Sequence, residues 1–112
     1  MIASTNNDLT YLHANVCQAL ADPKRIQILY ALGDKPYHVN SLAHDLNIPQ
    51  PTVSRHLRIL RQQSLVATER DGVGVIYRLT DPRIIQVLDT LRLLLVEAIA
   101  RKTAVLNGSQ RA

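Results

Sequence analysis

The chain has 112 residues and a mass of 12.5 kDa, which fits one domain with its own core. Apolar residues make up 46% and charged residues 20%, which argues against a disordered chain. The net charge of +4 favours a polyanionic partner, with nucleic acid ahead of a membrane surface. The single cysteine, Cys17, excludes an internal disulfide framework. Because we find no signal peptide and no apolar run that spans a bilayer, we expect a cytoplasmic protein without a membrane partner.

The first third of the sequence predicts two helices. Residues 1–7 are polar and are expected to be flexible. From Asp8, apolar residues at helical spacing predict a first helix, with Asn7 or Asp8 as its cap. These apolar residues are Leu9, Leu12, Val16 and Leu20. Asp22 as N-cap and Pro23 at the first helical position then predict a second helix, which we expect to end at Gly33.

The next segment predicts a helix-turn-helix. Asn40 is expected to cap a short third helix, and residues 47–51, with two prolines, predict a tight turn. A fourth helix is expected from about Pro51 to Gln63.

Two strands are expected to follow, residues 65–70 and 75–80, with the turn residues 71–74 between them. Asp81 and Pro82 precede a last helix expected to end near Leu106, with Asn107 and Gly108 as its stop. The order α-α-α-α-β-β-α is that of a winged helix-turn-helix, mainly α with a small β-hairpin. We expect one domain over 8–106 and a flexible terminus over 107–112.

The fourth helix predicts a surface that contacts DNA. At 100° per residue, Val53, Leu57 and Leu60 lie within about 40° of the Val53 direction and must face the core. The opposite side and its flanks carry hydroxyl, amide and guanidinium groups that bind phosphates and base edges. They belong to Thr52, Ser54, Arg55, Arg58 and Gln62. Residues 50–80 contain five arginines and two acidic residues, which gives this segment a net charge of +3.

At four places the sequence resembles the ArsR/SmtB family of bacterial winged-helix repressors. The motifs are ALADPKRI at 19–26, QPTVSRHL at 50–57, RDG at 70–72 and YRL at 77–79. The resemblance implies a homodimer that binds an inverted repeat in double-stranded DNA and leaves it when a signal arrives. It implies that Gln50, Thr52, Ser54, Arg55 and His56 enter the major groove. It also implies that Arg70, Asp71 and Gly72 lie on the wing near the minor groove.

Two points within this resemblance stay open. Many relatives have a serine cap where this chain has Pro49, so either Gln50 caps the fourth helix or the helix starts later. His56 lies about 60° from the Val53 direction, so it either reads DNA or packs against the core.

The first and last helices predict a dimer interface. The last helix is apolar around much of its circumference, which one small domain cannot bury alone. The alternative is that both helices only cover their own core. The interface residues we expect are Leu9, Leu12, Val16, Leu88, Leu91, Leu95 and Ile99.

Relatives in this family often bind metals, yet their known ligand positions are altered here. The last-helix site corresponds to Asp81, Arg83, Leu94 and Glu97, where both histidines of the family site are replaced and one position carries a cation. The arsenic-type site corresponds to His38 and Asn40, where both cysteines are replaced. No cofactor is therefore expected.

One candidate metal site survives. His13 and Cys17, at i and i+4, combine with His38, and with His44 or Asp45, in a candidate site for a divalent metal. The alternatives are that Cys17 is a packing residue or a redox-active thiol.

An enzyme is not expected, because the sequence lacks a glycine-rich phosphate loop, a Ser-His-Asp arrangement and a plausible carboxylate pair. The rival hypothesis is a winged helix that binds protein or RNA. Arg55, Arg58 and Arg70 favour duplex DNA instead.

Overall fold

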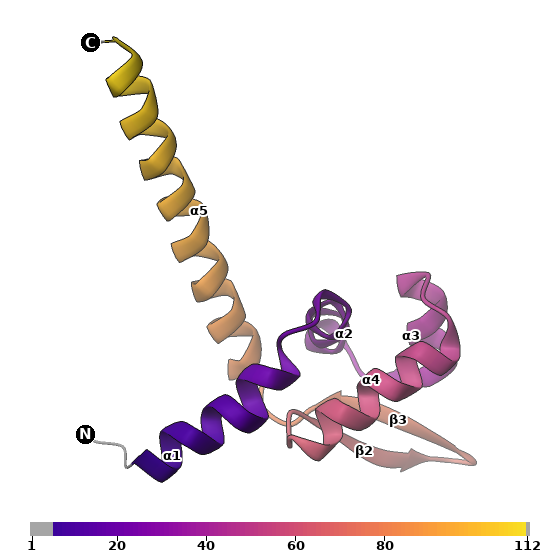
Figure 1. The fold of residues 1–112 in the computed structure, drawn as a ribbon. Coiled ribbons are helices and arrows are strands. Elements are labelled where there is room, and N and C mark those ends of the chain that lie inside the picture. The colour runs from indigo at the N-terminus through magenta and orange to yellow at the C-terminus, as the bar shows by residue number, and fades with distance from the viewer. Residues whose placement is uncertain (1–5, 112) are drawn as a thin grey trace. The chain divides into compact units, whose positions relative to one another are not determined.

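The computed structural model describes residues 6–111, with side chains over 6–108. It divides into two compact units, residues 1–82 and 83–112. The first unit contains the helix-turn-helix and the hairpin, and the second is one long helix (Figure 1). None of the described helices is both long and apolar enough to cross a membrane.

The first unit begins with a helix that changes its hydrogen-bond pattern. α1 (Asn6–Tyr11) passes directly into η1 (Leu12–Cys17), a π-helix. The expectation that residues 1–7 precede the helix is wrong for Asn6 and Asn7, and residues 1–5 lie outside the described part of the chain. None of the residues in α1 and η1 is buried, so their apolar side chains lie on the surface of this unit.

α2 (Pro23–Asp34) starts as its sequence predicts. The Asp22 carboxylate accepts a hydrogen bond from the Lys24 backbone N–H at 2.8 Å, and Pro23 occupies the first turn. This bond holds the pKa of the Asp22 carboxyl below its ordinary value. The helix continues one residue past Gly33, because Gly33 does not adopt the left-handed conformation that would end it.

α3 (Val39–Leu46) and α4 (Gln50–Gln62) form the helix-turn-helix. The predicted Asn40 cap is wrong, since His38 is the N-cap residue of α3. Asn47 ends α3 with φ of 55°, a conformation that asparagine tolerates, and the next N–H, of Ile48, donates to the Ala43 carbonyl at 3.0 Å. This turn, with Ile48 buried, sets the path into α4.

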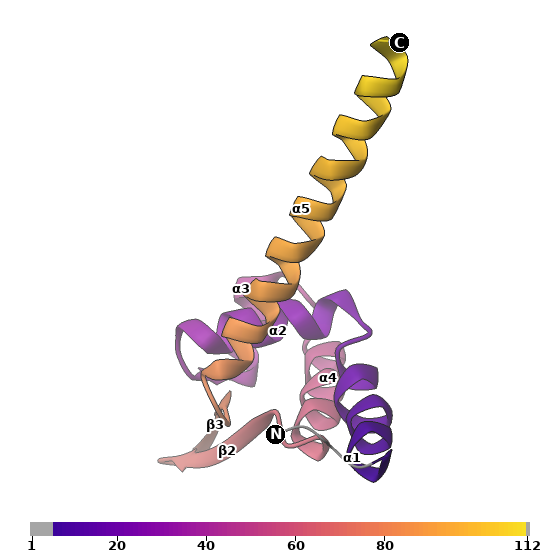
Figure 2. The same cartoon turned by 90° about the vertical axis from the view of Figure 1, so that its left-hand side faces the viewer.

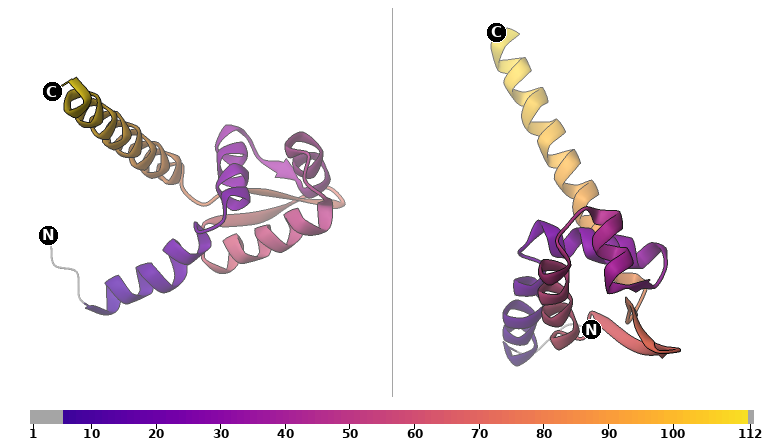
Figure 3. Two further views of the ribbon diagram at one scale, coloured as in Figure 1. Left: turned by 45° about the horizontal axis from the view of Figure 1, so that its top comes forward. Right: turned by 90° about the vertical axis from the view of Figure 1, so that its right-hand side faces the viewer.

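The sheet has three antiparallel strands in the order β1-β3-β2. β2 (Val66–Asp71) and β3 (Gly74–Leu79) form the predicted hairpin, which extends beyond α3 and α4 of the same unit in Figures 2 and 3. β1 (Tyr37–His38) pairs with β3 and was not predicted, because two residues carry no readable alternation. Thr80 fastens the end of the hairpin to its start, donating from its hydroxyl to the Ser64 carbonyl at 2.8 Å.

The core of the first unit lies where α2, α3 and α4 meet the sheet. Its largest fully buried side chains are aliphatic, as a composition with only 4% aromatic residues requires. They are Ile28, Leu29, Leu42, Val53, Leu57, Leu60 and Val66.

α5 (Arg83–Arg111) forms the second unit. The predicted end at Leu106 is wrong: the helix continues through Asn107 and Gly108, and Gly108 does not take the positive φ of a helix-ending glycine. A glycine inside a helix costs only about 1 kcal/mol relative to alanine, so it does not by itself stop one. Ala112 lies outside the described residues.

Truncating the core side of α4 tests this packing. We expect Leu57→Ala to lower the free energy of unfolding by about 2–5 kcal/mol, because Leu57 is fully buried and the change leaves a cavity. Val73→Ala is the matched control, since Val73 is 104% exposed at the hairpin turn and its truncation should cost less than about 0.5 kcal/mol. Urea denaturation of both variants measures the difference. Equal losses would contradict the assigned core.

Candidate nucleic-acid interface

The start of α4 differs from both alternatives that Pro49 left open. The helix begins at Gln50, with Pro49 as its N-cap residue and no side-chain cap. The Pro49 carbonyl accepts from the N–H groups of Thr52 and Val53 at 3.0 and 3.1 Å. Gln50 is therefore not the cap, and its side-chain amide instead donates to the Ser54 hydroxyl at 2.9 Å. Gln50 and Ser54 thus lie together on one exposed side of the first turn.

Burial fixes the rotation of α4 about its axis. Val53, Leu57 and Leu60 are each 0% exposed, as their spacing predicts. Arg55 and Arg58 are exposed, and Thr52 and Ser54 are partly exposed beside them. The helix therefore presents two guanidinium groups and two hydroxyl groups on its outer side, which are groups that bind phosphates and base edges.

His56 belongs to the interior rather than to this outer side. It is 4% exposed, and its Nδ1 lies 3.3 Å from a terminal guanidinium nitrogen of Arg25. Burial lowers the pKa of the His56 imidazole below its ordinary value, and the positive charge of Arg25 lowers it further while Asp22 opposes the shift. Of the two roles left open by the sequence, burial favours packing.

The hairpin carries the second group of predicted interface residues. Arg70 and Asp71 end β2 and are exposed, and the two-residue turn Gly72-Val73 follows them. Gly72 has φ of +65° and Val73 does not have a positive φ, which is the pattern of a type II′ turn. Glycine is therefore required at the first turn position.

A histidine ties the hairpin to the helix-turn-helix. His38 Nε2 lies 3.1 Å from an Asp71 carboxylate oxygen, and His38 Nδ1 lies 3.1 Å from the Val75 carbonyl. A Cβ atom on Gly74 would lie 3.0 Å from the His38 ring, so a larger residue there would push the ring aside by a few tenths of an ångström. This contact could not be predicted from residue spacing, because His38 is 33 residues from Asp71 and 37 residues from Val75.

The candidate metal and redox residues lie on different elements. His13 and Cys17 are exposed on η1, whereas His38 lies on β1 and contacts the hairpin. His44 and Asp45 are neighbours, with 3.5 Å between His44 Nδ1 and an Asp45 oxygen. Over the described residues, no group of three or more His, Cys, Asp and Glu side chains is arranged to hold a metal ion.

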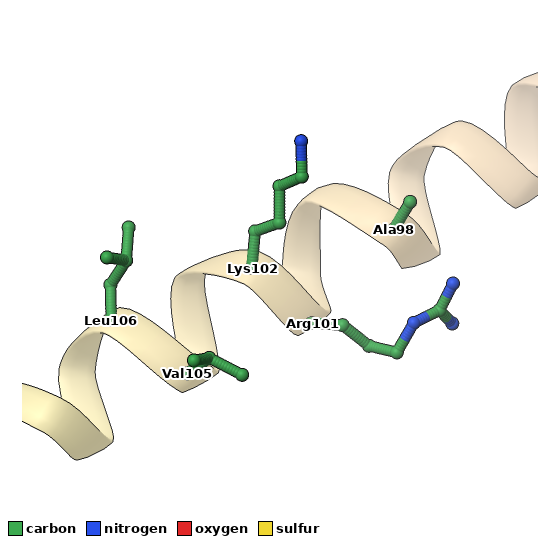
Figure 4. A pocket seen from close by; sticks show the side chains of 5 residues that line it. All are labelled: Ala98, Arg101, Lys102, Val105 and Leu106. Atoms are coloured by element: carbon green, nitrogen blue, oxygen red, sulfur yellow. The ribbon is translucent and has the colours of Figure 1, made fainter.

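The predicted dimer residues lie in both units. In the first unit Leu9 and Leu12 are exposed and Val16 is partly exposed. On α5, Leu88 is buried, whereas an apolar series along the rest of the helix is exposed. That series includes Leu91, Leu95 and Ile99. Farther along α5, Val105 and Leu106 continue it beside Arg101 and Lys102 in a shallow depression formed by this helix alone (Figure 4).

Comparison with known proteins matches the chain to a family of bacterial regulators. The family described as "Bacterial regulatory protein, arsR family" matches residues 22–68. The HTH-type transcriptional regulator KmtR of Mycobacterium tuberculosis is 40% identical over 82 residues, covering 73% of this chain and 63% of KmtR. The matched segment thus spans less than two thirds of that relative.

Two solved structures share the fold. The crystal structure of Mycobacterium tuberculosis Rv0081 superposes with a TM-score of 0.75 and 31% identity, covering 85% of this chain and 96% of the other. A solution structure from Mycobacterium bovis is similar with a TM-score of 0.73 and 25% identity, covering 87% and 92%. It is the homodimeric winged helix-turn-helix DNA-binding domain of Mb0332, a possible ArsR-family transcriptional regulator. With its winged helix-turn-helix fold and these matches, the chain belongs to the ArsR family of bacterial regulatory proteins.

Proposed function

We propose that this protein is a transcriptional regulator that binds an operator in double-stranded DNA as a homodimer and acts as a repressor. The observation that carries this proposal is the outer side of α4, where Arg55 and Arg58 are exposed opposite a fully buried apolar stripe. An unidentified signal would release the protein from its operator. Residues 8–106 act as one functional domain in this proposal.

Each part of the interface has its own task. Arg55 and Arg58 bind guanine edges or phosphates in the major groove, and Gln50, Thr52 and Ser54 hold the backbone at the start of α4. Arg70, Asp71 and Gly72 bring the hairpin to the neighbouring minor groove. His56 does not contact DNA in this proposal, because it is buried.

The distribution of charge supports a nucleic-acid partner. Residues 50–80 carry five arginines against Glu69 and Asp71, whereas residues 1–49 carry three basic and four acidic side chains. Arg78 lies 3.8 Å from Glu69 in an exposed pair, which stabilises the hairpin little and leaves most of the positive charge on the proposed interface.

The role of Arg55 can be tested on a duplex selected by the protein from a random pool. We expect Arg55→Ala to weaken binding by about 1–3 kcal/mol if its guanidinium pairs with a base, with a smaller loss on random DNA. Arg101→Ala, an exposed arginine on α5, is the control and should bind within about twofold of the wild-type protein. Fluorescence anisotropy measures both. An equal loss on selected and random DNA would reduce Arg55 to a phosphate contact.

Salt dependence separates this function from the rival one. Binding to duplex DNA releases counterions, so the affinity should fall steeply as salt rises. A winged helix that recognises protein or single-stranded RNA would instead bind the duplex weakly at every salt concentration. Failure of the wild-type protein to enrich any duplex from the pool would reject operator binding.

The homodimer is proposed to form through the first helix and α5. Leu9 and Leu12 are exposed on α1 and η1, and α5 exposes aliphatic side chains along most of its length. The homodimeric state of the similar Mb0332 domain supports this arrangement. A two-fold dimer places its two recognition helices about 34 Å apart, one turn of DNA.

A charge placed in this surface should separate the subunits. We expect Leu91→Glu, at a position that is 54% exposed in the single chain, to give monomers and to lose tight operator binding. Gln86→Glu is the control, since it adds the same charge to a polar position about 140° away around α5. Analytical ultracentrifugation gives the oligomeric state. A dimeric and fully active Leu91→Glu protein would refute this interface.

The proposal contains no metal or redox step. His13, Cys17 and His38 lie on elements that the described structure does not bring into one group of ligands. Cys17 is exposed, but the chain has no second thiol with which it could form an internal disulfide.

A further inference from the structure

One arginine connects three helical elements of the first unit. Arg25, in the first turn of α2, donates from Nε to the Ala19 carbonyl at 2.5 Å and from a terminal nitrogen to the Gln18 carbonyl at 3.2 Å. Its other terminal nitrogen lies 3.3 Å from Nδ1 of His56 on α4. A single guanidinium therefore holds the residues directly after η1, Gln18 and Ala19, and the middle of α4 together. His56 is buried in this contact, whereas its neighbour Arg55 is exposed.

The chemistry of the contact fixes the protonation state of His56. Arginine has only donors, so Nδ1 of His56 must accept, and the ring proton must lie on Nε2. An imidazolium carries a hydrogen on both nitrogens and cannot accept from Arg25. Protonation of His56 therefore breaks this link and places two positive charges side by side where little solvent reaches.

The surrounding charges favour the neutral ring near pH 7. Asp22, Lys24 and Arg25 act on His56 from α2, and Arg55 acts from α4 itself. Burial and the three cations lower the pKa of His56, and Asp22 alone opposes them. The link is thus intact at neutral pH and is lost on acidification.

We propose that Arg25 is a positioning residue for DNA binding, which fixes α4 relative to the first helix through His56 and releases it when His56 takes up a proton. The first helix carries Leu9 and Leu12 of the proposed dimer surface, which sets the spacing of the two subunits. The Arg25–His56 contact therefore connects this surface to α4, the helix proposed to contact DNA. The inference rests on the proposed function. The proposed effect of acidification on DNA affinity is opposite to the usual one, because protonation of surface histidines adds positive charge and strengthens binding to a polyanion.

The test compares binding at about pH 7.5 and about pH 5.5, at constant ionic strength, on a duplex selected from a random pool. We expect the wild-type protein to bind more weakly at the lower pH, with a loss of affinity that grows as the pH falls through the lowered pKa of His56. His56→Asn places an amide oxygen close to the position of Nδ1, which accepts from Arg25 and does not titrate. This variant should bind within about threefold of wild type at the higher pH and keep its affinity on acidification.

Arg25→Met and Lys24→Met form a matched pair, because each removes one positive charge from adjacent positions and only Arg25 contacts the first helix and His56. We expect Arg25→Met to weaken binding about tenfold or more at the higher pH and to remove its pH dependence, and Lys24→Met to do neither. Circular dichroism and ultracentrifugation must show that both variants fold and dimerise. If Arg25→Met fails to fold or to dimerise, the test uses the binding of His56→Asn and the NMR signals of the His56 ring nitrogens instead.

A measurement without DNA distinguishes failure of this inference from failure of the proposed function. Nitrogen NMR should show Nδ1 of His56 without a proton at about pH 7.5. Acidification should shift the amide signals of Gln18 and Ala19 in the wild-type protein and not in His56→Asn. The positioning role is wrong if Nδ1 already carries the proton, if these amides do not respond, or if wild type and His56→Asn lose affinity equally.

Discussion

The rotation of α4 about its own axis is the constraint on which the rest of the interface depends. Val53, Leu57 and Leu60 are fully buried, and a helix with three such residues on one side has a single orientation that buries them all. That orientation leaves Arg55 and Arg58 exposed. The core of the unit and its outer charge are therefore two consequences of one packing arrangement, and a loss of burial would disorder the groups of the proposed interface as well as destabilise the fold.

Three further contacts fix the turn into α4 and the position of the hairpin in the first unit. The left-handed Asn47 sets the turn into α4, Thr80 closes the base of the hairpin, and His38 holds the turn end of the hairpin through Asp71. The last contact lies between exposed groups, and the His38 ring lies close to Gly74. The hairpin is thus held firmly at its base by backbone pairing and weakly at its turn, where it would meet DNA of varying groove width.

Much of this arrangement could be predicted from residue spacing, because the determining signals are local. The cap and proline at 22–23, the apolar spacing in α4 and the turn residues at 71–74 each act within a few residues. The contacts that escaped prediction join distant parts of the chain. β1 has two residues, His38 meets a partner 33 residues away, and Arg25 meets His56 across 31 residues. The end of α5 escaped for another reason, since Asn107 and Gly108 weaken a helix without ending it.

The burial of His56 beside Arg25 decides between a DNA-reading role and a titrating role for this residue. A base-reading residue must be exposed, and a titrating residue beside a cation in the core must lose its partner when it gains a proton. His56 is only 4% exposed and lies beside Arg25, so it is suited to titrate in the core and not to read bases. Because the folded state disfavours the protonated ring, the unfolded chain takes up the proton first as pH falls below about 6.5. Acidification therefore lowers the free energy of unfolding through this residue, and the same proton that loosens α4 also weakens the core that orients Arg55 and Arg58.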